Sequence, residues 1–152
     1  MVSLKFGDII LTASMDKKFK VLSHTADIGI IAYGKDMKEA FGNAAKGMFS
    51  LITEPNEIRE IEYRDIKVSA PDMESLLVAW LNELIYLFDV DNILFKKFDI
   101  SQLSETQLSA RAYGEKVDIT RHKLKLGVKA ATYHMLKIEK GKTNRVQVIF
   151  DI

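Results

Sequence analysis

The stretch "SHTADIGI", residues 23–30, places a compact polar group inside an apolar, strand-like pattern. Its His24 and Asp27 are residue types that bind metal ions or move protons. Two interpretations remain open. Either Asp27 is a metal ligand or a catalytic carboxylate, or the group marks a β-bulge, with Gly29 at the kink and His24 packed and hydrogen-bonded.

A second candidate is the end of the sequence, "RVQVIFDI", residues 145–152. Apolar residues alternate there as in a β-strand, and no polar tail follows. Asp151 therefore stands beside the carboxylate of Ile152, and two adjacent anions on an ordered strand repel each other. A hard divalent cation would relieve that repulsion, and oxygen ligands suit Ca²⁺, Mg²⁺ or Mn²⁺ better than Zn²⁺. The alternative is a solvated chain end with an exposed aspartate.

The stretch "VKAATYHML", residues 128–136, carries a third polar group that includes Lys129 and His134. Regular strand alternation would put Thr132 and His134 on one face, and Tyr133 and Met135 on the other. A histidine in such a strand is either a hydrogen-bonded structural residue or a base or metal ligand, and the pattern leaves both open.

The basic residues cluster once, in "DITRHKLKLG", residues 118–127. The cluster is made of Arg121, His122, Lys123 and Lys125. It is either a solvated loop or a contact for a phosphate or an acidic partner.

Two amphipathic helices and a series of strands must position these groups. Apolar residues at i, i+3 and i+4 predict helices over residues 36–52 and 69–92. Asp36 with Glu39 resembles a capping box for the first helix. Ser69 or Asp72 is expected to cap the second helix, with Pro71 in its first turn.

The remaining sequence has the pattern of β-strands. Residues 19–34 give one or two strands, broken near residues 27–29, and further strands are expected over residues 61–70, 94–101, 106–114, 126–140 and 144–152. This order predicts an α+β fold, a single domain in which mostly antiparallel β-sheets pack with two helices. Residues 1–15 form an extension that is either an added strand, "DIILTA", or disordered, with Met15 as an alternative start.

Composition narrows the class of protein. The chain has 152 residues, 47% of them hydrophobic, a net charge of +1 and no cysteine. The hydrophobic share is enough for one sizeable core. The net charge gives no overall electrostatic attraction for nucleic acid, and the absence of cysteine rules out disulfides and thiolate metal sites. No apolar run approaches the roughly 20 residues that span a bilayer, and no signal peptide is evident, so we expect a cytoplasmic protein. The phosphate-binding loop GxxxxGK[ST] and the GxGxxG, HExxH and GxSxG motifs are also absent from the sequence.

Several of these stretches together resemble the archease family. The specific ones are "HTADIGI" (24–30) and the pair "VKAATYH" (128–134) and "VIFDI" (148–152), supported by the helix "LLVAWLNELIYLFD" (76–89). The resemblance begins near Phe19 and extends to Ile152, which predicts an archease-like domain over residues 16–152.

The resemblance implies a function that composition does not. Archeases are accessory proteins of the RtcB-type RNA ligase, which uses GTP and Mn²⁺ to join tRNA halves, and they promote its guanylylation and turnover. The family binds a divalent metal, and the corresponding ligands here are Asp27, Asp151 and the carboxylate of Ile152. We therefore expect a non-enzymatic ligase activator in which His24, Lys129 and His134 support the metal or contact the partner, and RNA is contacted through the ligase.

Two other functions remain open. One is a chaperone-like partner of a tRNA cytosine methyltransferase, which some accounts of the family stress. The other is a metal-dependent phosphohydrolase that uses the same carboxylates.

Overall fold

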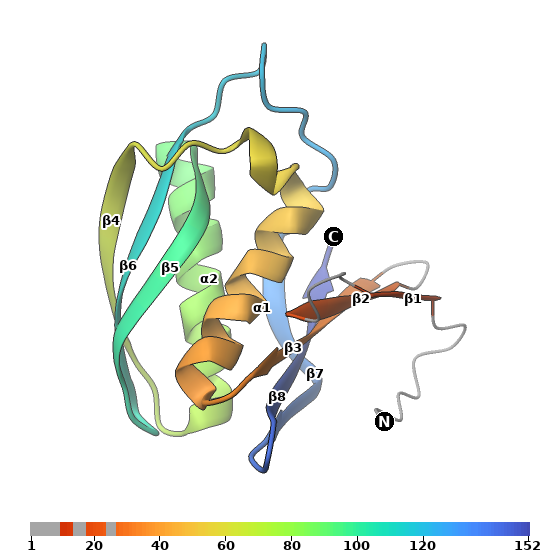
Figure 1. The fold of residues 1–152 in the computed structure, drawn as a ribbon, viewed down its shortest axis with the longest axis vertical. Helices are drawn as coiled ribbons and strands as arrows, with labels where there is room; N and C mark the ends of the chain where they lie inside the picture. Colours follow the sequence, from red (N-terminus) through yellow and green to blue (C-terminus); the bar gives the residue numbers. More distant parts are fainter. Residues whose placement is uncertain (1–9, 14–17, 24–26) are drawn as a thin grey trace.

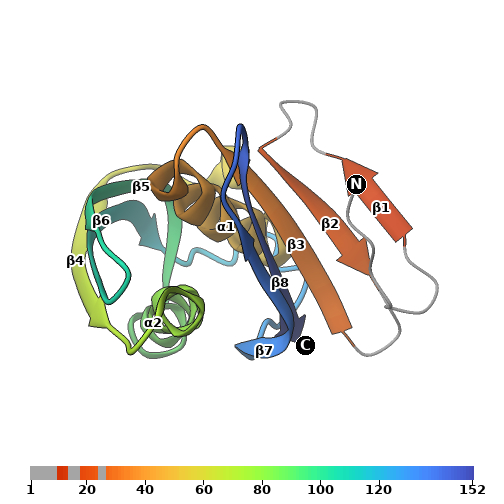
Figure 2. The same cartoon turned by 90° about the horizontal axis from the view of Figure 1, so that it is seen from below.

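The structure is a computed structural model, and it describes residues 10–13, 18–23 and 27–152. Two helices lie between two antiparallel sheets, so the protein has three layers (Figures 1 and 2). The described residues confirm the predicted α+β fold with antiparallel sheets and two amphipathic helices.

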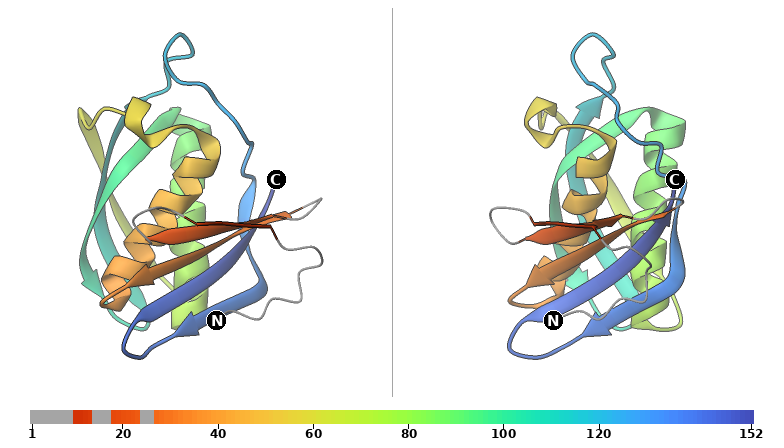
Figure 3. Two further views of the ribbon diagram at one scale, coloured as in Figure 1. Left: turned by 45° about the vertical axis from the view of Figure 1, so that its right-hand side comes forward. Right: turned by 90° about the vertical axis from the view of Figure 1, so that its right-hand side faces the viewer.

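One sheet has the strand order β1-β2-β3-β8-β7, and its strands are Ile10–Ala13, Phe19–Ser23, Asp27–Gly34, Asn144–Asp151 and Ala130–Glu139. The other has the order β4-β6-β5, and its strands are Glu62–Ser69, Gln107–Lys116 and Ile93–Leu103. The helices between them are α1, Met37–Ile52, and α2, Met73–Asp91, and a short 3₁₀ turn covers Pro55–Glu57. Figure 3 shows β7 and β8 running side by side to the end of the chain.

Helix α1 begins where its capping residues predict. Asp36 is the N-cap, and its carboxylate accepts the Glu39 N–H at 2.8 Å. The Glu39 carboxylate in turn accepts the Lys35 N–H at 2.8 Å. These bonds satisfy donors that a helix start leaves without partners, so the local sequence is sufficient to set this boundary.

Helix α2 differs from the prediction at its first turn. Asp72 is the N-cap and accepts the Ser75 N–H at 2.7 Å, whereas Ser69 is the last residue of β4. Pro71 precedes the cap, so its prediction as a first-turn residue was wrong. Trp80 is fully buried, and its indole N–H donates to the Phe41 carbonyl at 3.0 Å, which ties α2 to α1.

Residues 19–34 form two strands, β2 and β3, as one of the two predictions had it, but the predicted break does not lie at residues 27–29. Strand β3 runs through Gly29, which pairs with Leu22 on β2 and with Ile149 on β8, without a shift of register. Gly29 lies in a closely packed part of the sheet rather than at a kink: a Cβ there would lie 2.7 Å from the Ile149 Cδ1 and 3.3 Å from the Val148 carbonyl oxygen. Residues 24–26, between β2 and β3, lie outside the described part of the chain.

The extension contributes strand β1, which pairs antiparallel with β2 at the edge of the five-stranded sheet (Figure 2). The division of the chain at residue 15 stays a prediction. In the described part of the chain, neither helix combines the length and apolarity needed to cross a membrane.

Candidate metal centre

The sheet register brings the two predicted aspartate ligands together. Asp27 is the first residue of β3 and Asp151 is the last residue of β8, and the two residues are directly paired across the antiparallel strands. On the other side of β8, Asp151 pairs with Ala130, the first residue of β7. The candidate centre therefore lies at one end of the sheet, with β8 in the middle.

Both aspartates belong to the face of the sheet that points away from the helices. The neighbouring residues Ile28 and Phe150 are buried in the core against the helices, and side chains alternate between the faces of a strand. Residues directly opposite each other in an antiparallel pair have Cβ atoms about 4.5–5.5 Å apart. The two carboxylates therefore start from neighbouring positions on one face.

This placement is electrostatically unfavourable for the protein alone. Like charges directly opposite each other in a sheet destabilise it by roughly 0.2–1 kcal/mol. Neither Asp27 nor Asp151 forms a side-chain ion pair with another described residue. Asp151 is exposed and Asp27 is half-buried, so both can be reached from solvent. An external cation would neutralise the pair.

Ile152 follows with its side chain packed against the core. This contact holds the last residue at the sheet instead of letting it extend into solvent. The Lys129 N–H donates to the Asp151 carbonyl at 2.8 Å, so the main chain is also fixed from the β7 side. Continuing the pairing of Ala130 with Asp151 by one residue places Lys129 beside Ile152.

The donor set fits a hard divalent cation. Two aspartates on one face, next to the main chain of Ile152, offer only oxygen atoms, which Ca²⁺, Mg²⁺ and Mn²⁺ prefer. Residues 10–13, 18–23 and 27–152 contain no group of three or more His, Asp or Glu side chains that could hold a metal. Any metal at this end of the described sheet therefore needs a donor beyond the two aspartate side chains.

The three predicted supporting residues have different positions. His24 lies outside the described residues. Lys129 is exposed and beside the centre, as the register shows. His134 is exposed on β7, and its backbone N–H donates to the Thr132 Oγ1 at 3.3 Å.

The expected alternation around His134 was wrong. The pairing of β7 with β8 shifts register between Thr132 and Lys137, so β7 bulges, and Met135 has a φ of 52°. The bulge is held by the Thr132 hydroxyl, which donates to the Ile149 carbonyl at 2.8 Å, and by the Gln147 amide, which donates to the Met135 carbonyl at 2.7 Å. The strand also begins at residue 130 rather than 126. The bulge exposes both Tyr133 and His134 near the centre.

Sequence reasoning missed Asn82, which fastens the start of β7. Its side-chain amide accepts the Ala131 N–H at 2.8 Å and donates to the Ala131 carbonyl at 3.4 Å. Asn82 thus fixes, from α2, the strand that flanks Asp151. The signal was present, because an asparagine interrupts the apolar run "LLVAWLNELIYLF" (76–88).

The predicted basic cluster is only in part a solvated loop: Lys123 and Lys125 are exposed, whereas Arg121 and His122 are bonded to the protein. His122 is only 2% exposed, and its Nε2 lies 2.9 Å from both a Glu115 carboxylate oxygen and the Glu57 carbonyl. Its Nδ1 accepts the Asp118 N–H at 2.8 Å, so the histidine is neutral with its proton on Nε2. Arg121 donates to Glu115 at 2.6 Å. Half of the cluster therefore serves folding rather than a phosphate.

Glu115 is the centre of this buried ionic group. Burial by itself would raise its pKa, but hydrogen bonds from Arg121, the Arg59 N–H and His122 outweigh that effect and hold the pKa at about 2. The group fixes the loop that leads to Lys129 and β7. Further along, the Lys125 N–H donates to the Ile52 carbonyl, and the Thr53 hydroxyl to the Lys123 carbonyl.

Residues 19–152 match the Archease protein family (MTH1598/TM1083). The chain belongs to the archease family. It is 40% identical over 144 residues to protein archease of Methanosarcina mazei, covering 91% of this chain and 99% of that protein. It is 39% identical over 138 residues to protein archease of Sulfurisphaera tokodaii, covering 90% of this chain and 99% of that protein.

Two solved structures share the fold. The solution structure of Methanobacterium thermoautotrophicum protein 1598 matches with a TM-score of 0.77 and 34% identity, over 89% of this chain and 99% of that one. The crystal structure of an archease from Thermotoga maritima, described as a possible chaperone, matches with a TM-score of 0.62 over 85% and 93% of the two chains. Its identity of 20% supports the fold alone.

Proposed function

We propose that this archease family member activates a GTP-dependent, RtcB-type tRNA-splicing RNA ligase through a divalent-metal site. The observation that carries the proposal is the direct pairing of Asp27 with Asp151 at the end of β3 and β8. Two carboxylates side by side, without an ion-pair partner among the described residues, can bind a cation.

The metal would be held by Asp27, Asp151 and the carboxylate of Ile152. The two side chains come from neighbouring strands, and the core contact of Ile152 keeps the third donor within the same end of the sheet. A bound divalent cation would supply positive charge for the phosphates of a nucleotide or of an RNA end. Ca²⁺, Mg²⁺ and Mn²⁺ are the candidate ions.

Residues around the centre would contact the ligase. Lys129 lies beside Ile152 and offers a cation for phosphate, while the β7 bulge exposes Tyr133 and His134. A tyrosine exposed on a fixed bulge is typical of an anchoring residue at a protein interface. The activator would thus present its metal and a set of rigid contacts together, in the cytoplasm, without performing catalysis itself.

A chaperone-like role is the second candidate, because the structurally similar Thermotoga maritima protein is described as a possible chaperone. In that role the chain would act on a tRNA cytosine methyltransferase. A pull-down from the native cytosol separates the two candidates by the enzyme that it recovers. A third possibility, phosphohydrolase activity, predicts hydrolysis of nucleotides or phosphoesters by the purified protein.

The ligase assay tests the proposal directly. Purified RtcB-type ligase is incubated with GTP, Mn²⁺ and tRNA halves, and guanylylation and multiple-turnover ligation are measured with the wild-type chain, with Asp27→Ala and with Asp151→Ala. The wild type should accelerate both steps, and both variants should lose most of that effect while keeping their circular dichroism spectrum. Full activation by both variants would contradict the proposal.

A further inference from the structure

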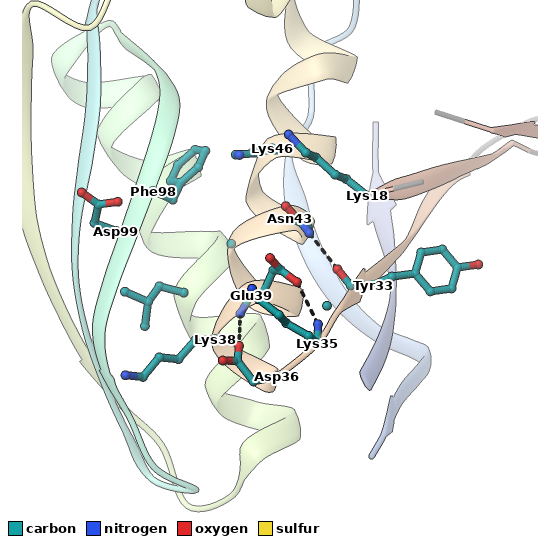
Figure 4. A pocket seen from close by; sticks show the side chains of 13 residues that line it. Lys18, Tyr33, Lys35, Asp36, Lys38, Glu39, Asn43, Lys46, Phe98 and Asp99 are labelled. Carbon is teal, nitrogen blue, oxygen red and sulfur yellow. Dashed lines mark hydrogen bonds between the residues drawn. The ribbon is translucent and has the colours of Figure 1, made fainter. Parts of the chain in front are cut away.

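Strand β4 forms an open edge of the three-stranded sheet. The order β4-β6-β5 leaves β4 paired on one side only, and in the described part of the chain no other element lies beyond it (Figures 1 and 2). The opposite edge differs, because Lys38 of α1 donates to the Ser101 carbonyl of β5 at 3.3 Å across the groove between them (Figure 4). On β7, Asn82 bonds both backbone groups of Ala131. An unpaired edge such as β4 is a template for another strand.

The hydrogen bonds to β6 fix which backbone groups of β4 face outward. Ala70, directly after β4, donates its N–H to the Thr106 carbonyl at 2.9 Å, in register with the pairing of the two strands. Because such bonds alternate along an antiparallel pair, the even-numbered residues of β4 bond to β6 and the odd-numbered ones point their N–H and C=O outward. The Tyr63 carbonyl agrees with this, because it accepts the Arg64 guanidinium at 2.9 Å. The outward residues are Tyr63, Asp65, Lys67 and Ser69.

The four outward residues are all exposed, and two of them are charged. Asp65 stands opposite Arg111 of β6 and accepts its Nε–H at 2.8 Å. Lys67 stands opposite Ser109, which carries no charge. Lys67 forms no ion pair with a described residue, although its charge acts at longer range on Asp65. On this edge the lysine, and not the aspartate, therefore has room for a further partner of opposite charge.

A second copy of the chain can extend this edge in one favourable register. Two identical antiparallel strands are related by a two-fold axis, and outward-pointing residues must pair with outward-pointing residues. With the axis at Ile66, Asp65 faces Lys67 of the second copy, and Lys67 faces Asp65 of the second copy. An axis at Asp65 would instead bring two aspartates together, and an axis at Lys67 two lysines. Like charges directly opposite each other destabilise a sheet, so the axis at Ile66 is preferred.

We propose that a second copy of the chain pairs with β4 through this edge, so that two three-stranded sheets become one antiparallel sheet of six strands with its two-fold axis at Ile66. Asp65 keeps its bond to Arg111, because a carboxylate offers about four lone-pair sites and can accept from Lys67 of the second copy as well. Charges that protect an exposed edge against most foreign strands are thus complementary to a second copy in this register. Pairing of one strand with one strand gives a small interface, so the dimer should be weak.

Introduced thiols test the register directly, because the chain has no cysteine. Tyr63→Cys and Ser69→Cys are prepared as separate full-length proteins, at two exposed positions, and are mixed under mild oxidation. In the proposed pairing position 63 of one copy faces position 69 of the other, with Cα atoms about 5.5 Å apart, within reach of a disulfide. Two copies of the same variant hold their thiols roughly 20 Å apart along the strands. The mixture should therefore form cross-linked dimer at least about tenfold faster than either variant alone.

A charge exchange tests the ion pairs. Sedimentation equilibrium at up to about 1 mM protein measures the dimer affinity, and circular dichroism confirms that each variant is folded. Lys67→Asp puts two carboxylates opposite each other and should weaken the dimer at least about tenfold. Asp65→Lys/Lys67→Asp restores opposite charges in the same register and should recover the affinity to within about threefold of wild type. Lys123→Asp, the matched control at an exposed lysine in the loop before β7, should stay within about twofold.

Three results would each overturn the proposal. They are a wild-type chain that stays monomeric at about 1 mM, a thiol mixture that cross-links no faster than the single variants, and a charge-exchanged double variant that dimerises as weakly as Lys67→Asp. The first result would leave the β4 edge to an extended segment of another protein. The proposal is independent of ligase activation, because the metal centre lies in the other sheet, at the ends of β3 and β8. Asp27→Asn should therefore dimerise as the wild type does.

Discussion

Glu115 and the pair Asp27–Asp151 show two opposite uses of carboxylates in one small protein. Glu115 is buried and receives hydrogen bonds from Arg121, His122 and a backbone N–H, so every negative oxygen has a donor. Asp27 and Asp151 face each other across two strands, and neither has a described ion-pair partner. A carboxylate whose oxygens accept hydrogen bonds from the protein supports the fold, whereas two adjacent carboxylates without ion-pair partners among the described residues are available to bind a ligand.

The largest expected effect is on stability, at Glu115. Glu115→Ala removes the acceptor of a buried ionic group, which should lower the free energy of unfolding by about 3 kcal/mol. This value is at the low end of the effect of breaking a buried ion pair, because Arg121 is partly exposed and can still be solvated. Metal affinity should change less than threefold. Urea denaturation measures the free energy of unfolding, and calorimetric titration measures the metal affinity. A variant that keeps its stability but no longer binds metal would show that Glu115 belongs to the metal centre and not to the fold.

The same group predicts a smaller, pH-dependent loss. Because the folded pKa of Glu115 is about 2 and its ordinary value is 4.5, the unfolded chain binds the proton more tightly. The stabilisation is therefore fully present above about pH 4.5 and is lost as pH falls through about 2. Denaturation from pH 7 to pH 3 should show a steeper decline below pH 4.5 for wild type than for Glu115→Gln. Parallel curves would show that Glu115 is not held ionised by its partners.

The aspartate pair should respond in the opposite way. Asp27→Asn and Asp151→Asn should each weaken divalent-cation binding at least tenfold, which corresponds to about 1.4 kcal/mol. In metal-free buffer each should leave stability unchanged or raise it by up to about 1 kcal/mol, because like-charge repulsion is removed. Calorimetry and thermal unfolding in chelator measure the two effects. If the variants unfold at a clearly lower temperature in chelator, the two aspartates support the fold as Glu115 does.

The smallest effect concerns the third donor. Extending the chain by a short flexible segment after Ile152 converts its carboxylate to an amide, which leaves a neutral carbonyl as the weaker ligand. Metal affinity should fall by about three- to tenfold, and an equal extension before Met1 should have no effect. The fold should persist because Val146, Val148 and Phe150 still fill the core. Equal affinities for both extended proteins would exclude the Ile152 carboxylate as a ligand.

Local sequence was sufficient for the helices. Apolar spacing located both, and Asp36 and Asp72 begin them because a short acidic side chain accepts N–H groups that a helix start leaves free. Alternation located the strands of both sheets within a few residues. These features depend on neighbours in the chain, so the sequence carries them without reference to the fold.

Strand interruptions were less predictable. A glycine at position 29 looked like a kink but packs closely against Ile149, while the bulge of β7, at residues 132–137, carries no glycine. The bulge depends on Gln147 of β8 and on the hydroxyl of Thr132, contacts between strands that no local pattern reveals. His122 was misjudged for the same reason, because its partner Glu115 enters from another element.

By itself, the sequence determined the residue types of the candidate centre, the family, the helices and most strands. Only the tertiary structure decided that Asp27 and Asp151 are opposite each other and that Glu115 is satisfied. The physical reason is that carboxylates act through their distances to groups on other strands and loops. Strand register and helix packing fix those distances, and neither is written in local periodicity.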